Sequence, residues 1–120
     1  MTQTQALLAS LVLEVPLVLG VAAALGWCRG RGPLVRLLLV ACAATLVTHP
    51  FAWHAFRGLA PLIDYWPRAA LVEGAVALTE GLLFARVAGL GARRGLALGF
   101  SANAFSYGLG LVLWRLLDAA

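Results

Sequence analysis

Four long apolar stretches follow one another along the chain, separated by short turns rich in arginine, glycine and proline. They cover about residues 6–28, 34–56, 68–90 and 96–117. Each has the roughly 20 apolar residues that a helix needs to cross a bilayer. Their continuous hydrophobicity favours helices, because barrel strands alternate apolar and polar residues in pieces of about ten. The pattern predicts an all-α fold, a polytopic membrane four-helix bundle that forms a single membrane domain over residues 1–120.

Composition also indicates a protein embedded in a membrane. Hydrophobic residues make up 62% of the chain and charged residues 12%, which lies outside the usual range of soluble domains. The first stretch carries Glu14, has no basic residue before it and is followed by no small-x-small cleavage site. We therefore expect it to remain as a membrane span instead of being removed as a signal peptide.

Arginines mark the turns and set the expected orientation. The turns after the first and third stretches carry or adjoin one group of arginines, and the opposite side carries a smaller group together with two aspartates. The first group is Arg29, Arg31, Arg36, Arg86, Arg93 and Arg94, and the opposite side has Arg57, Arg68, Arg115, Asp64 and Asp118. Because short arginine-rich loops stay cytoplasmic, we expect both termini to face outward.

The charge of the chain and its choice of basic residue bear on partners and location. The arginines concentrated in the turns on one side of the membrane account for the net charge of +4. The positive charge is therefore no argument for nucleic-acid binding, and we expect the lipid bilayer as a partner and no binding to nucleic acid. Arginine is used to the exclusion of lysine, as in GC-rich bacterial genomes, which predicts a multi-pass protein of the bacterial inner (cytoplasmic) membrane. Trp53, Trp66 and Trp114 fall at predicted outer ends, where an interfacial aromatic belt is expected.

Three glutamates, Glu14, Glu73 and Glu80, lie inside the apolar stretches. An ionisable side chain in hydrocarbon is costly unless it faces water or a protein interior, so it marks a functional site by default. At about 1.5 Å per residue, Glu14 and Glu73 fall in the outer half of the membrane and Glu80 near its midplane. Glu80 follows Glu73 by one heptad, which places both on nearly the same helix face. We predict that the three carboxyls are proton or cation sites.

Uncharged polar residues and one histidine reach similar depths from the other helices. Thr45, Thr48 and His49 share one face of the second stretch through their spacing of three and four residues. Asn103 and Ser106 arrive near the membrane centre from the fourth stretch. We expect these groups and the glutamates to form one cluster open to the outside, with His49 as a relay and the other four as supporting polar groups.

Structural explanations compete with the functional one for each of these residues. Ser, Thr and Asn inside membranes often only join helices by hydrogen bonds, and a neutral carboxylic acid can do the same. His49 fits a proton relay, a metal ligand or a satisfied interior histidine. Glu14, His49 and Glu73 have the chemistry of metal ligands, but no HExxH or CxxC spacing accompanies them, so we expect no metal and no other cofactor.

The two halves of the chain share a loose pattern. A glutamate, Glu14 or Glu73, is followed by an arginine-glycine turn and then by a polar residue, Thr45 or Asn103. The interval from glutamate to polar residue is 31 in the first half and 30 in the second. Two duplicated helical hairpins lying side by side explain the pattern, and chance similarity between apolar sequences is the alternative.

Three short motifs carry a resemblance to other proteins. They are Thr48-His49-Pro50, Glu73 with Glu80, and Asn103-x-x-Ser106. On these motifs the chain resembles small, uncharacterised bacterial membrane proteins with four helices, over most of its length. The resemblance implies an architecture and lends no activity. Glu14 in the first span is similar to the coupling glutamate of the small multidrug resistance transporters, but the two further glutamates depart from that family, so its mechanism is not carried over.

Taken together, the polar residues favour transport of a proton, a cation or a small solute through an outward-open cavity lined by intramembrane glutamates. The main alternative is a non-catalytic subunit or assembly factor of a membrane complex, in which the carboxyls bond partner helices. A membrane enzyme ranks third, because no recognisable nucleophile or metal set accompanies the acid and base groups, and no catalytic residue is assigned. Four helices barely enclose a pore, so we expect a homo-oligomer or a partner in a membrane complex.

Overall fold

The computed structural model describes residues 2–119, and this part of the chain is all-helical, with four helices and no strand. In chain order the helices are α1 (Gln3–Ala24), α2 (Arg31–Gly58), α3 (Tyr65–Arg86) and α4 (Ala92–Ala119). Each covers most of one apolar stretch of the sequence, with ends that differ by a few residues. The apolar stretches of the sequence therefore predict where the four helices lie, although the hydrophobicity of α3 is interrupted by charged residues.

Glycines in left-handed conformations terminate the helices at two of the three connections. Gly26 and Gly30, with φ angles of 70° and 90°, lie between α1 and α2, and Gly89 and Gly91, with φ angles of 76° and 86°, lie between α3 and α4. Glycine adopts such angles without the steric cost that other residues incur. As a result α1 ends at Ala24 and α3 at Arg86, each before the last residues of its apolar stretch.

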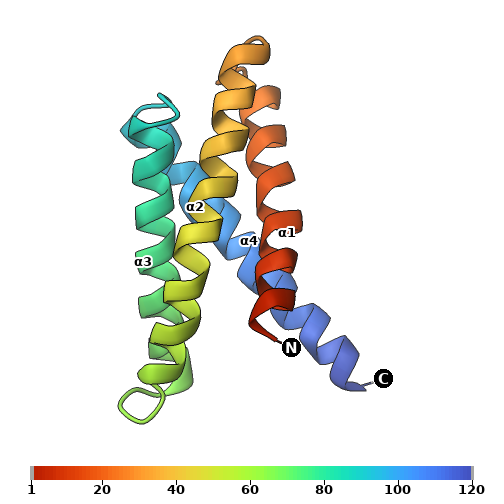
Figure 1. Cartoon of the computed structure of the whole chain (residues 1–120), viewed down its shortest axis with the longest axis vertical. Coiled ribbons are helices and arrows are strands. Elements are labelled where there is room, and N and C mark those ends of the chain that lie inside the picture. The colour runs from red at the N-terminus through yellow and green to blue at the C-terminus, as the bar shows by residue number, and fades with distance from the viewer. Residues whose placement is uncertain (1, 120) are drawn as a thin grey trace.

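The four helices contact one another in a closed order. α1 packs against α2 and α4, and α3 packs against the same two helices. In Figure 1, α1, α2 and α3 run roughly along the long axis, and α4 crosses them obliquely. Both termini lie at the end of the molecule that holds the α2–α3 connection, here called the terminal end. The α1–α2 and α3–α4 turns lie at the opposite end, here called the turn end.

α3 and α4 touch through their backbones at Gly81, Gly95 and Gly99, a contact we call the glycine seam. A Cβ atom added to Gly95 would lie 2.5 Å from the backbone nitrogen of Ala85. One added to Gly99 would lie 2.6 Å from the carbonyl oxygen of Ala77. Small residues permit such close approach of helices inside membranes. Gly95 and Gly99 accordingly accept no larger residue unless a helix moves, and Gly81 is tightly packed against Leu96.

The half of the molecule towards the turn end is filled by apolar side chains. Leu37 of α2, Phe84 of α3 and Leu98 of α4 are each at most 2% exposed, and Val18 and Ala22 of α1 pack into the same cluster. Close packing of this kind leaves few voids larger than a water molecule. The cavity described below lies on the other side of this core, towards the terminal end.

Three helices, α1, α2 and α4, are long and apolar enough to cross a membrane. α3, with 22 residues, carries Arg68, Glu73, Glu80 and Arg86, and any 18 consecutive residues within it include three of these four charged side chains. Charged groups are tolerated at membrane depth where they face protein or a water-filled cavity. Whether α3 can lie at membrane depth therefore depends on whether its glutamates face the other helices.

Candidate functional site

Glu80 is the most enclosed of the three glutamates, with 2% of its surface exposed. The hydroxyl of Thr48 on α2 donates a hydrogen bond to Oε1 of Glu80 at 2.7 Å. Nδ2 of Asn103 on α4 donates to Oε2 at 2.9 Å and also to the carbonyl oxygen of Gly99 at 2.9 Å. Both carboxyl oxygens thus accept a hydrogen bond, and Glu80 joins three helices.

The glycine seam explains why Asn103 reaches Glu80. Asn103 follows Gly99 by four residues, so the two lie one turn apart on the same face of α4. Gly99 would place a Cβ atom 2.6 Å from the backbone nitrogen of Gly81, the residue that follows Glu80. With the backbones this close, the short side chain of Asn103 spans the remaining distance to the carboxyl.

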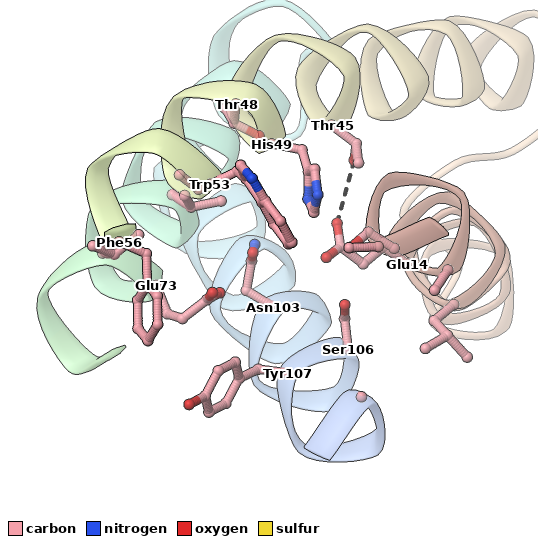
Figure 2. Close-up of a pocket in the computed structure, with 18 of the residues that line it drawn as sticks. Glu14, Thr45, Thr48, His49, Trp53, Phe56, Glu73, Asn103, Ser106 and Tyr107 are labelled. Atoms are coloured by element: carbon pink, nitrogen blue, oxygen red, sulfur yellow. Dashed lines mark hydrogen bonds between the residues drawn. The ribbon is translucent and has the colours of Figure 1, made fainter. Parts of the chain in front are cut away.

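Glu14 forms a second polar contact, between α1 and α2. Its side chain is 6% exposed, and the Thr45 hydroxyl donates to its Oε2 at 3.2 Å. Figure 2 shows this bond and also shows the Ser106 hydroxyl of α4 pointing towards the Glu14 carboxyl. The Glu14 carboxyl therefore lies where α1, α2 and α4 approach one another.

Glu73 and His49 are half-buried and point into the space between the helices (Figure 2). Nε2 of His49 is buried and has no hydrogen-bond partner within residues 2–119. The imidazole lies beside the Trp53 indole, with 6.4 Å between ring centroids. A buried polar atom without a partner is costly, so Nε2 is available to a ligand or to water.

A cavity of about 560 Å³ occupies the half of the molecule towards the terminal end. All four helices contribute to its wall. Every residue predicted from the sequence as a proton, cation, relay or supporting site lines it: Glu14, Thr45, Thr48, His49, Glu73, Glu80, Asn103 and Ser106. From Glu80 the cavity extends to Ala6, Arg57 and Trp114, which lie towards the terminal end. The structure thus brings the predicted residues together, while their function stays a prediction.

The cavity has acidic groups in its interior and a basic side chain towards the terminal end. The side chains that hydrogen-bond the carboxyls of Glu14 and Glu80 are neutral. Among the lining residues, the basic side chains are His49 and Arg57; Arg57 is exposed and lies 6.0 Å from the centroid of the Trp53 ring. Within residues 2–119, no three His, Cys, Asp or Glu side chains are grouped so that they can hold a metal ion.

Aromatic side chains also line the cavity, and the sequence pattern did not predict them as site residues. They are Trp53, Phe56, Tyr65, Tyr107 and Trp114. The interfacial belt expected from the sequence accounts for Trp53 and Trp114 only by their position along the helix. Trp53 and Phe56 follow His49 by four and seven residues, which places them on its helix face, so helical spacing was a usable signal. Tyr65 and Tyr107 share a hydrogen bond of 2.8 Å between their hydroxyls.

Known proteins do not identify this arrangement. No family model matches the chain, and no curated protein or solved structure matches it either. What the cavity does is therefore inferred from its own residues.

Proposed function

We propose that the chain is an integral membrane protein that moves a proton, a cation or a small solute through its cavity. The observation that carries the proposal is that Glu14 of α1 and Glu73 and Glu80 of α3 line one cavity, and that the other helices around it, like α1, are apolar enough to cross a membrane. Carboxyls kept at such depth usually serve binding or proton exchange. In this proposal the glutamates are the proton or cation sites, and His49, whose Nε2 has no hydrogen-bond partner within residues 2–119, relays protons between them and water.

The proposed architecture is a bundle of four membrane-crossing helices in the bacterial inner membrane, with both termini and the cavity facing outward. The position of both termini and the α2–α3 connection at one end supports an even number of crossings. Arg29 and Arg31, and Arg93 and Arg94, lie at the turn end, as the cytoplasmic preference of arginine-rich loops requires.

This orientation predicts an active enzyme when alkaline phosphatase is fused after the C-terminus, because that enzyme folds only outside the cytoplasm. A fusion placed in the turn between α1 and α2, after Arg29, should be inactive and serves as the matched control. Activity of the turn fusion together with an inactive C-terminal fusion would reverse the orientation and make the cavity face the cytoplasm.

We also propose that the bundle consists of two related helical hairpins. In support, α1 and α3 both have 22 residues, and α2 and α4 both have 28. Each hairpin turn contains two glycines with positive φ. The two hairpins lie side by side, and the cavity is formed between them.

The transport proposal is tested in proteoliposomes with an imposed pH gradient. We expect the wild-type protein to support gradient-dependent flux with at least one member of a panel of inorganic cations, organic amines and neutral solutes. Glu73→Gln and Glu80→Gln should remove that flux, because an amide keeps the size and hydrogen bonding of the acid and cannot exchange a proton. Asp64→Asn, at an exposed residue outside the cavity, should leave the flux unchanged.

The hydrogen bonding of Glu80 favours a second candidate, a non-catalytic subunit or assembly factor that works as a homo-oligomer or with a membrane partner. Both oxygens of that carboxyl are occupied by Thr48 and Asn103, as in a structural joint between helices. If no solute in the panel moves and the Gln variants assemble normally, the transport proposal is wrong and this candidate takes its place.

A further inference from the structure

The size of the cavity suits a molecule larger than an ion. Pockets that enclose small organic ligands measure about 300–1,000 Å³, whereas a water molecule takes about 30 Å³. The cavity, at about 560 Å³, lies within the range for organic ligands. All four helices contribute residues to its wall.

The wall of the cavity is mostly apolar and partly aromatic. Ala9, Leu13, Ala52, Val72 and Val76 line it together with the aromatic side chains described above. Apolar lining with a few convergent polar groups is typical of sites that bind an organic molecule by its body and orient it by its polar end.

The charged groups in the cavity indicate which charge the polar end of such a molecule should carry. Glu80 is already bonded through both oxygens, which leaves Glu14 and Glu73 as the acidic groups available to a ligand. Glu73 is half-buried and points into the cavity between Phe56 and Tyr107 in Figure 2. A cation at this position neutralises a carboxylate that is otherwise costly in an apolar site.

Two aromatic rings of the cavity wall already lie close to cationic side chains of the protein. The guanidinium of Arg68 lies 4.2 Å from the centroid of the Phe56 ring, and that of Arg57 lies 6.0 Å from the Trp53 ring. Trp and Tyr rings attract ammonium groups through the negative potential of their faces. The cavity thus combines carboxyls and aromatic faces, the two groups that bind an alkylated ammonium ion.

We propose that the cavity binds a small organic cation with an apolar body, its positive group held by Glu73 and Glu14 and its body held against Trp53, Phe56 and Tyr107. The inference rests on the proposed function and specifies its substrate class. It separates an organic ammonium ion from an inorganic cation, which takes a shell of oxygen ligands instead of aromatic and aliphatic carbon.

Binding is measured with purified protein in detergent, from the tryptophan fluorescence of the cavity and by calorimetry. The probe is benzyltrimethylammonium, and its controls are sodium and the neutral carbon isostere neopentylbenzene. We expect benzyltrimethylammonium to bind, and neither control to compete with it. Tighter or equal binding of the neutral isostere would show that the apolar wall alone holds the ligand and would overturn the proposal.

Matched variants separate the cavity from the rest of the surface. Glu73→Gln and Glu14→Gln should each weaken binding about tenfold or more, as expected when one partner of a desolvated charge pair is removed. Asp64→Asn removes an exposed carboxylate outside the cavity and should bind as the wild type does. Equal affinity in all three variants would contradict the assignment of the carboxyls.

A space-filling pair tests whether the ligand enters the cavity. Ala52→Phe places a ring inside it and should abolish binding, whereas Ala43→Phe, on the exposed face of the same helix, should not. Unchanged binding in Ala52→Phe, with the variant eluting as the wild type does, would overturn the proposal. Because binding needs no gradient, a protein that binds the probe and moves no solute refutes transport alone. Gradient-driven flux of protons or sodium without probe binding refutes the organic cation alone.

Discussion

Replacing Gly99 with leucine is expected to leave no folded protein in detergent. The added side chain begins 2.6 Å from the backbones of Ala77 and Gly81, so α3 and α4 have to separate along the glycine seam. Gly99→Ala is the milder change, and it should lower the free energy of unfolding by about 1–3 kcal/mol, the usual cost of overpacking. Titration with sodium dodecyl sulfate, followed by circular dichroism, shows whether Gly99→Leu is folded at all and measures the free energy of unfolding of Gly99→Ala.

Gly108 provides the matched control for the seam. It lies on the same helix, is exposed, and would meet no atom within 4 Å if it carried a Cβ. Gly108→Leu should therefore unfold at the same denaturant fraction as the wild type, or at a slightly higher one, because leucine has the better helix propensity. Equal stability of Gly99→Leu and Gly108→Leu would show that the helices do not meet through these glycines.

The second large effect is expected at Glu80, where leucine and glutamine should behave differently. Glu80→Leu removes both acceptors and leaves the Thr48 hydroxyl and one of the two N–H groups of the Asn103 amide unpaired, at about 1–3 kcal/mol for each unpaired group, while the other N–H keeps its bond to Gly99. In Glu80→Gln, the amide oxygen accepts from Asn103 and the amide nitrogen donates to the Thr48 hydroxyl, which also accepts hydrogen bonds. Glutamine should therefore cost less than about 1 kcal/mol.

Glu73→Leu is the control for that comparison, because Glu73 is half-buried and lies one heptad away on the same helix. Its substitution should change the unfolding midpoint far less than Glu80→Leu does. All variants are compared by their yield of monodisperse protein and by their unfolding midpoint in detergent. A Glu80→Leu protein as stable as the wild type would show that the hydrogen bonds to Thr48 and Asn103 do not hold the helices together.

The sequence predicted the four helices because hydrophobicity is a local property that can be read along the chain. It did not predict the glycine seam. Gly95 lies just before the fourth predicted stretch, residues 96–117, so the sequence pattern does not pair it with Gly99, four residues later, as a packing motif. In the structure α4 begins at Ala92, which places Gly95 inside the helix. Composition locates the end of a helix only to within a few residues, because helix ends fray and charged residues beside them can belong to either the turn or the helix.

Sequence spacing also grouped Glu73 and Glu80 on one helix face without distinguishing their surroundings. Glu80 adjoins Gly81 in the seam, where α4 is close enough for Asn103 to bond it. Glu73 lies two turns nearer the terminal end, where it lines the cavity. The difference between an enclosed and an accessible carboxyl follows from the distance between helices, which helical periodicity does not contain.

The glycine seam also bears on the transport proposal, which requires the cavity to open in turn to each side of the membrane. Because the backbones of α3 and α4 are in contact along the seam, we expect these two helices to move together, so that the α1–α2 hairpin would have to rock against them. Within residues 2–119, three buried hydrogen bonds join side chains of different helices. Thr45–Glu14 stays inside one rocking unit and Asn103–Glu80 inside the other. The Thr48–Glu80 bond crosses the boundary, so the alternating access that the transport proposal requires would break and re-form it in every cycle.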